Sequence, residues 1–349
     1  NMQGAYIQEG EYHGQAFKAA LYSLLHRHEV LRTHFASADN EAWQVIEDAP
    51  QLPLIEYDLT LLDDEERTEK VLSIFKQEGQ AAFDLNQELM LRVILIKVEA
   101  KRQLVMFTIH HIACDGWSMV IFQSELQAFY DAHRRGGTAP LAPLAIQYAD
   151  YADWQREWMS GDVLAQQQAY WRKQLQDVPQ LHSLPLDYKR PVNQTFRGKM
   201  FKQTLPSSTV AALQALCQMH DVTLFMLMET AFALLLSRYS NEQDIVVGSA
   251  VAGRGHQDLE GLIGFFINSV ALRTDLSGNP TFVELLERNK QVVLDAYAHQ
   301  DVPFDMLVEE LRPERNLSYN PIFQIMFAVE RHEVAEPSSV QAPLLRSIE

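Results

Sequence analysis

Cysteine is scarce in this 349-residue sequence, with only Cys114 and Cys217 present. Two cysteines cannot build a disulfide framework, so the fold must rest on a packed core. Low cysteine usage is also typical of proteins that work in a reducing compartment, and we expect a cytoplasmic protein. The chain opens without a convincing start, so we expect its numbering to begin inside a longer polypeptide.

Positive charge is also in short supply, because 29 lysines and arginines stand against 46 aspartates and glutamates, for a formal net charge of −17. Proteins that bind nucleic acid or anionic membranes present clustered positive charge, so neither class of partner is expected. The longest apolar run, at 224–237, is interrupted by Glu229 and Thr230. It is shorter than the about 20 residues that a membrane span needs.

Hydrophobic residues make up 47% of the chain, which predicts well-packed globular units, and the length predicts two of them. Periodicity lapses around residues 177–195, where three prolines occur. We therefore predict an N-terminal lobe at 1–177, a linker at 178–195 and a C-terminal lobe at 196–349.

Apolar spacing predicts several elements of a mixed α/β fold. Two continuous apolar runs separated by a charged turn indicate a buried antiparallel hairpin, and an acidic stretch at 63–70 indicates a solvated helix face. The predicted helices lie at 17–25, 119–135 and 223–239, and the predicted strands lie at 30–35, 91–98, 103–109 and 245–251.

The sequence HHIACDGWSM follows the second strand of that hairpin, at 110–119. Successive side chains of a strand point to opposite faces, so His110 and His111 are not expected to face one cavity if the strand persists. One histidine should have a structural role while the other takes part in the chemistry, and binding of one metal ion by both is disfavoured. Imidazole exchanges protons near neutral pH, which suits acyl transfer from an ester or thioester.

The residues after the histidines have supporting roles in this interpretation. Asp115 either orients a histidine or pairs with Arg32, which lies in an apolar stretch and needs a counter-charge if buried. Gly116 permits close backbone approach or a positive φ, and Ser118 is placed to cap the following helix. The spacing of Tyr148, Tyr151 and Trp154 predicts core packing on one side of a helix.

The motif, with Trp117 before Ser118, resembles the signature of condensation domains of nonribosomal peptide synthetases, in the chloramphenicol-acetyltransferase-like superfamily. The resemblance covers residues from about 2 to 330. Four further stretches match that family in order: RHEVLRTHF (27–35), YADYADWQ (148–155), IGFFINSVALR (263–273) and HQDVPFDMLVEELRPERNLSYNPIFQIMF (299–327).

The resemblance implies two chloramphenicol-acetyltransferase-like lobes, each a mostly antiparallel or mixed β-sheet with packed helices, arranged as a V-shaped pseudo-dimer with a tunnel between them. His111 would be catalytic, as a base or a positioning group. His110, Asp115, Gly116, Trp117, Ser118 and Arg32 would support it, with Asp115 paired to Arg32. Asn268 and Ser269 are candidates for the tunnel lining.

The implied reaction is attack of a carrier-bound acceptor amine on a carrier-bound donor thioester. The implied partners are donor and acceptor peptidyl carrier domains and a neighbouring adenylation domain. No intrinsic cofactor is expected, since the substrates are carried on phosphopantetheine of the carriers. The alternatives are an epimerisation domain, in which serine usually precedes tryptophan, a non-catalytic recruitment module of the same fold, and a free coenzyme A thioester acyltransferase.

The sequence departs from the family pattern at both ends. The family's first motif is absent, and the chain stops soon after position 327, where further sheet and helix are expected. It also contains no serine-bearing carrier motif and no nucleotide-binding loop, so carrier and activating functions are expected to lie elsewhere.

Overall fold

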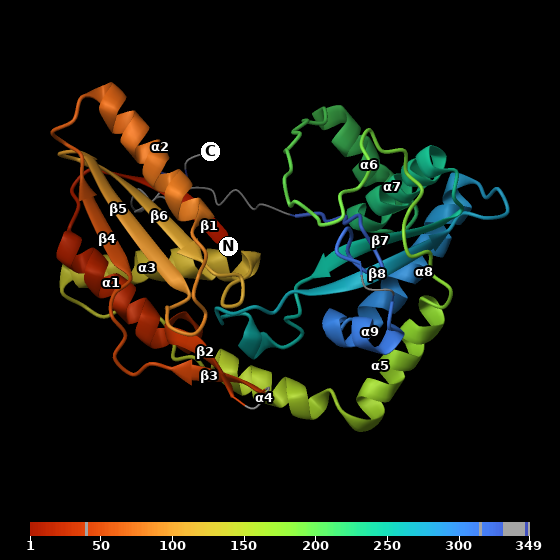
Figure 1. Ribbon diagram of the computed structural model, residues 1–349, viewed down its shortest axis with the longest axis horizontal. Coiled ribbons are helices and arrows are strands. Elements are labelled where there is room, and N and C mark those ends of the chain that lie inside the picture. Colours follow the sequence, from red (N-terminus) through yellow and green to blue (C-terminus); the bar gives the residue numbers. More distant parts are fainter. Residues whose placement is uncertain (39–40, 314–315, 331–345, 348–349) are drawn as a thin grey trace. The chain divides into compact units, whose positions relative to one another are not determined.

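The computed structural model in Figure 1 divides into two compact units. The first unit contains Asn1–Glu157, Arg254–Phe266 and strand β9, and the second contains Trp158–Gly253 and the residues from Ile267 to Glu330. This division differs from the predicted one, because residues 158–177 pack with the second unit and residues 254–266 return to the first. The structure describes residues 1–38, 41–313, 316–330 and 346–347, so the rest of the predicted C-terminal lobe lies outside the described residues.

The sheet of the first unit has the strand order β4-β5-β6-β1-β9. Its neighbours are antiparallel except for the parallel pair β4–β5. The predicted hairpin is confirmed, with β5 and β6 paired from Leu91 opposite Ile109. The strands are β1 (Met2–Glu9), β4 (Leu54–Asp58), β5 (Leu91–Glu99), β6 (Arg102–Ile109) and β9 (Arg346–Ser347).

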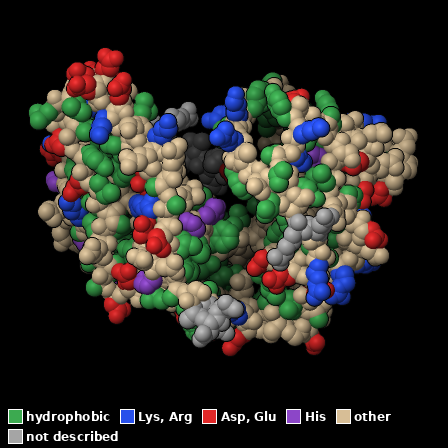
Figure 2. Space-filling model, viewed as in Figure 1, with side chains coloured by type: hydrophobic (Ala, Val, Ile, Leu, Met, Phe, Trp, Pro, Cys, Tyr) green, Lys and Arg blue, Asp and Glu red, His purple; other side chains and the backbone are tan. Residues whose placement is uncertain are grey.

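Helices cover both faces of this sheet, which explains why its central strands are apolar on both sides. Helices α1 (Gly14–Arg27) and α3 (Gly116–Arg135) pack on one face, around a core that includes Phe107 and Phe122. Helix α2 (Asp64–Gln80) covers the other face through Ile74. The predicted solvated face is confirmed, because acidic side chains gather at the start of α2, at the upper left in Figure 2.

The connection after α1 differs from its prediction. Residues 30–32 belong to the short 3₁₀ helix η1 (Glu29–Arg32), and the strand starts only at Thr33. The remaining elements of the first unit are the hairpin β2 (Thr33–Ala38) and β3 (Glu41–Ile46), most of α4 (Tyr148–Trp158), and η2 (Gln257–Leu259).

The second unit is built on the antiparallel pair β7 and β8, with a core that includes Val247, Leu272 and Val293. Gly248 exchanges backbone hydrogen bonds with residues 325 and 327, and a Cβ there would lie 2.2 Å from the ring of Phe323. The elements are α5 (Gly161–Gln174), α6 (Ser207–Met219), α7 (Leu224–Ser240), β7 (Asp244–Val251), β8 (Asn268–Asp275), α8 (Phe282–Ala298) and α9 (Phe304–Leu311).

The segment between α5 and α6 has no helix or strand, although the whole of it is described. It extends from about 175 to 206 and so exceeds the predicted linker at 178–195. None of the described helices is by itself long and apolar enough to cross a bilayer; only α6 and α7 taken together, bent by 104°, meet that criterion by length and composition.

Candidate functional site

The two histidines lie on a turn directly after β6. The strand ends at Ile109, and Ala113 N closes the turn by donating to the carbonyl of His110 at 3.0 Å. The alternation of strand side chains therefore does not extend to these residues. Their rings nevertheless have different surroundings, because each is held by its own set of contacts.

His111 is fixed by one hydrogen bond and one ring contact. Its Nδ1 lies 2.7 Å from the carbonyl oxygen of Cys114. A carbonyl only accepts, so Nδ1 carries the proton and Nε2 of the neutral ring keeps its lone pair. The ring also meets Phe265 edge-on, with centroids 5.2 Å apart and planes at 88°. This half-buried imidazole is arranged to accept a proton at Nε2.

His110 is held differently. Its Nδ1 accepts from Ile112 N at 3.1 Å, and its ring packs edge-on against Phe83. The guanidinium of Arg92 in turn lies 3.9 Å from the centroid of the Phe83 ring. Burial lowers the pKa of His110, and the neighbouring imidazole of His111 lowers it further. A support role for His110 and a working role for His111 stay predictions.

The thiol of Cys114, which lies between His111 and Asp115 in the sequence, lacks the features of a nucleophile. Cys114 is buried, and burial raises the pKa of its thiol, with the neighbouring Asp115 adding to the effect. Thiolates are the reactive form, so this cysteine is kept in its unreactive form.

Asp115 caps helix α3 and joins it to a distant segment. Its Oδ1 accepts from Ser118 N at 2.8 Å and from Ser118 Oγ at 2.7 Å, and its Oδ2 accepts from Phe266 N at 3.1 Å. The predicted cap at Ser118 is therefore wrong. Asp115 is the N-cap, since its carboxylate satisfies a free N–H of the first turn.

The charged partner of Asp115 is Arg254, whose Nη2 lies 3.2 Å from Oδ1. Both side chains are almost fully buried, at 2% exposed for Arg254 and 4% for Asp115. Arg254 also donates to Ser118 Oγ at 2.8 Å and lies over the ring of Phe266 at 4.0 Å. Burial lowers the pKa of the guanidinium while Asp115 raises it, so the carboxylate offsets the cost of burying the cation.

The predicted pairing of Asp115 with Arg32 is wrong. Arg32 is buried, but its Nη2 lies 3.2 Å from Oε1 of Glu29 and its Nη1 donates to the carbonyl of Glu47 at 2.5 Å. Arg32 therefore stabilises the turn that leads into β2. The residue that sequence reasoning missed is the arginine that follows β7, at position 254.

The two residues between Asp115 and Ser118 are exposed. An added Cβ at Gly116 would meet no atom of the described chain within 4 Å, and its φ is not left-handed, so neither the close backbone approach nor the positive φ that glycine would permit is seen here. Trp117 is 48% exposed and donates from Nε1 to the carbonyl of Glu260 at 3.0 Å. Its ring therefore presents an apolar surface at the start of α3.

The two predicted tunnel residues lie in the second unit, at the start of β8. Asn268 Nδ2 donates to the carbonyls of Gln300 and Val302, both at 2.7 Å, and its Oδ1 accepts from Phe304 N at 3.1 Å. The amide therefore holds the loop before α9. Ser269 is half-buried and pairs with Ala250 in the sheet. A tunnel role for either stays a prediction.

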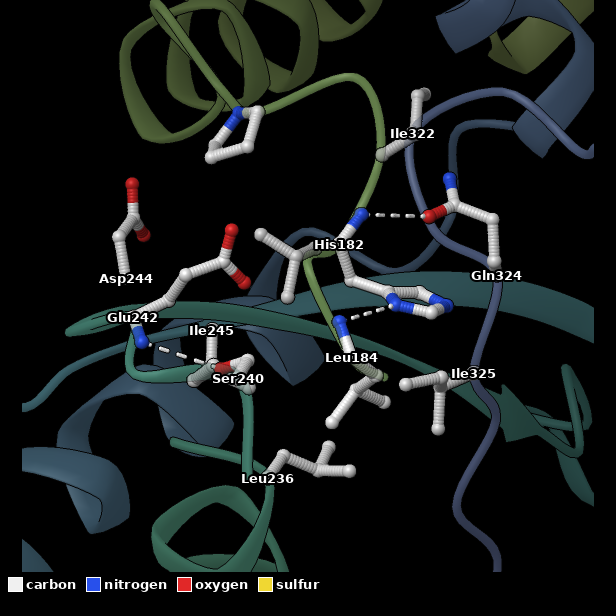
Figure 3. Close-up of a pocket in the computed structure, with 12 residues that line it drawn as sticks. His182, Leu184, Leu236, Ser240, Glu242, Asp244, Ile245, Ile322, Gln324 and Ile325 are labelled. Atoms are coloured by element: carbon white, nitrogen blue, oxygen red, sulfur yellow. Dashed lines mark hydrogen bonds between the residues drawn. The ribbon is translucent and has the colours of Figure 1, made fainter. Parts of the chain in front are cut away.

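Figure 3 shows a pocket in the second unit, away from the histidine motif in sequence. At its edge His182 N donates to Gln324 Oε1 at 3.3 Å, and its apolar lining includes Leu236 and Ile245. The cavity of about 20 Å³ has room for about one water molecule. Among the residues that the structure describes, no group of three or more His, Cys, Asp and Glu could hold a metal ion.

Comparisons with known proteins all indicate the same family. The profile of the family described as Condensation domain matches residues 1–344. One of the proteins that make up the linear gramicidin synthase of Brevibacillus parabrevis is 46% identical over 330 residues, which are 95% of this chain and 4% of that protein. The chain thus spans only a small part of the synthetases that it matches. Phosphinothricin tripeptide synthetase PhsC of Streptomyces viridochromogenes is 40% identical over 90% of this chain and 29% of its own length.

Solved structures agree with the fold. The X-domain from teicoplanin biosynthesis is 31% identical, with a TM-score of 0.88 over 99% of this chain and 76% of that one. The first condensation domain of the calcium-dependent antibiotic synthetase is 20% identical, with a TM-score of 0.72 over 99% and 79%, and supports the fold alone. The predicted mixed α/β fold of the chloramphenicol-acetyltransferase type is confirmed. The chain belongs to the condensation-domain family of nonribosomal peptide synthetases.

Proposed function

We propose that this chain catalyses amide-bond formation between two carrier-bound substrates. The observation that carries the proposal is the geometry of His111, which donates Nδ1–H to the carbonyl of Cys114 and so keeps Nε2 as an acceptor. The motif around it is intact, and Asp115 is committed to Arg254 and to the start of α3. Asp115 is thus a structural residue, and His111 is the proton acceptor.

In this reaction the acceptor's amine nitrogen attacks the donor's thioester carbon, and the carbon–sulfur bond breaks as the tetrahedral intermediate collapses. The amine loses one proton and the departing thiolate gains one, so His111 Nε2 can take the first and return it to sulfur. An α-amine titrates near pH 8, so roughly a tenth of it is already unprotonated and nucleophilic at neutral pH. His111 therefore acts while the bond forms, by positioning the amine and accepting its proton.

The substrates in this proposal are held on phosphopantetheine arms of donor and acceptor carrier domains, in a cytoplasmic synthetase with a neighbouring adenylation domain. The support is the match to multidomain synthetases over almost the whole chain. Carrier domains are usually acidic, so local positive charge must attract them to this acidic chain. Two candidates are the basic stretches at 133–137 and 187–191.

The test is a condensation assay with loaded donor and acceptor carriers, read by the intact mass of the acceptor carrier. Formation of the condensed product supports the proposal, and separate L- and D-loaded donors give the stereochemical preference. Inversion of the donor residue without condensation would identify an epimerisation domain instead. Consumption of a free coenzyme A thioester without reaction of any carrier would identify a free-standing type of acyltransferase.

A second candidate is a non-catalytic recruitment module. It is favoured by the likeness to the X-domain, which has been solved in complex with OxyB from teicoplanin biosynthesis, at 31% identity and a TM-score of 0.88. A chain of this kind would form no product with any loaded carrier. It would also keep its function when His111 is replaced, which separates it from the catalytic proposal.

A further inference from the structure

The segment at 263–266 is held to the first unit through four successive residues. Each contributes at least one backbone group that is bonded to a side chain from elsewhere in the chain. The contacts are Ile263 N to His28 Nδ1 at 3.4 Å, Gly264 N to Ser118 Oγ at 3.0 Å, Tyr148 Oη to the carbonyl of Phe265 at 2.9 Å, and Phe266 N to Asp115 Oδ2 at 3.1 Å. The backbone of this segment is therefore fixed by side chains that lie at the end of α1, at the start of α3 and on α4.

Close packing adds to these hydrogen bonds. A Cβ at Gly264 would lie 2.3 Å from the ring of Tyr148 and 2.7 Å from the ring of Phe266. Only glycine fits there without moving an aromatic ring. The ring of Tyr148 thus lies directly against the backbone of the segment, while its hydroxyl bonds the next carbonyl.

Phe265 is the one residue of the segment that is both aromatic and substantially exposed. It is 38% exposed, whereas Ile263 and Phe266 are buried. The ring of Phe265 instead meets the imidazole of His111 edge-on, at 5.2 Å between centroids. Because the Phe265 ring is exposed, it adds little to the packing of the hydrophobic core. Core packing therefore does not explain its contact with His111.

The His111 ring needs this contact because a single hydrogen bond does not fix it. The bond from Nδ1 to the Cys114 carbonyl holds one edge, but rotation about the side-chain torsions can still break it. Phe265 lies against the ring at nearly a right angle and opposes that rotation. The two contacts together keep Nε2 in one direction.

We propose that Phe265 is a positioning residue for His111, and that the hydroxyl of Tyr148 holds Phe265 in place. This inference rests on the proposed function for its kinetic consequence, but the orientation of the imidazole can be measured without any substrate. Phe265 acts through His111 and does not itself exchange a proton.

The test compares Phe265→Ala, Phe265→Tyr and Tyr148→Phe by two readouts. The first is the ¹⁵N spectrum of the His111 imidazole, assigned by its loss in His111→Gln. We expect wild type and Phe265→Tyr to show Nδ1 protonated and Nε2 unprotonated, and Phe265→Ala to show a mixture of tautomers. The second readout is condensation kinetics, for which we expect a loss of about 10- to 100-fold in kcat for Phe265→Ala, with little change in KM.

Tyr148→Phe keeps the ring against Gly264 and removes only one hydrogen bond, so we expect a smaller loss in kcat, about 2- to 10-fold. The control is Phe282→Ala in the second unit, a phenylalanine that is 39% exposed, which should leave kcat unchanged. Unaltered tautomers and kcat in Phe265→Ala would overturn the inference. A wild type that forms no amide would refute the proposed function, while the nitrogen spectrum would still decide the positioning role.

Discussion

Replacing Asp115 with asparagine should destabilise the first unit before it affects chemistry. The carboxylate accepts from Ser118 N, Ser118 Oγ, Phe266 N and the guanidinium of Arg254. Asparagine has the same shape, but its amide nitrogen is a donor and must face one of these donors. It also removes the negative charge beside a guanidinium that is only 2% exposed.

The size of the effect follows from that burial. Removing one partner of a buried, hydrogen-bonded ion pair costs about 3–5 kcal/mol, because the other charge is left without compensation. For a unit of this size, such a loss lowers the melting temperature by roughly 6–20 °C. The double variant Asp115→Asn/Arg254→Met removes both charges, so it should be less destabilised than the sum of the single variants.

The assay is thermal and urea unfolding of the four proteins of this double-mutant cycle, with condensation kinetics measured on each. Asp58→Asn is the matched control, since Asp58 is 59% exposed beside Lys97 and its replacement should leave the melting temperature almost unchanged. If Asp115→Asn keeps the wild-type melting temperature and loses turnover, Asp115 acts in catalysis and the structural assignment is wrong.

Three further substitutions test other parts of the structure. Burial raises the pKa of the Glu229 carboxyl from 4.5 to about 7, although a hydrogen bond from Asn289 partly opposes this shift. The ionised carboxylate therefore destabilises the folded protein, and this effect begins above pH 4.5 and is complete above about pH 7. Glu229→Gln should therefore add about 3 kcal/mol of unfolding free energy at pH 8 and almost none at pH 4, and equal gains at both values would contradict this. Asn268→Ala leaves the carbonyls of Gln300 and Val302 and the N–H of Phe304 without their hydrogen-bond partner, and it should lower the free energy of unfolding in urea by about 2–4 kcal/mol. An unchanged urea midpoint would show that other contacts hold this loop. Gly264→Ala should lower the melting temperature by several degrees, because its Cβ would lie within 3 Å of two rings, and a wild-type value would show that these rings can move.

The elements that the sequence predicts well are those with a strong local pattern. The hairpin at 91–109 is apolar on both faces because helices cover both sides of its sheet, and the helix at 224–240 carries a continuous apolar stripe. The strand predicted at 30–35 starts later in the structure, because its first apolar side chains pack equally well from a short 3₁₀ helix. Its burial can be predicted from the sequence, but its backbone conformation cannot.

The candidate site shows where sequence reasoning ends. Proximity along the chain identifies the histidines and Asp115, and aspartate directly before the first turn of a helix is itself a preferred N-cap, the position that Asp115 occupies and Ser118 does not. The partner Arg254 lies 139 residues away, and its selection over Arg32 depends on the return of residues 254–266 to the first unit. No local pattern carries that information.

The most direct test of this account is the yield of condensed product with His111→Ala compared with His110→Ala, measured by intact mass on loaded carriers. Both variants must first melt cooperatively near the wild-type temperature. We predict that His111→Ala loses most of the product while His110→Ala retains much more, because only His111 has its Nδ1 proton committed to a carbonyl and Nε2 left to accept. Full product formation by a folded His111→Ala protein would contradict the role of His111 as proton acceptor.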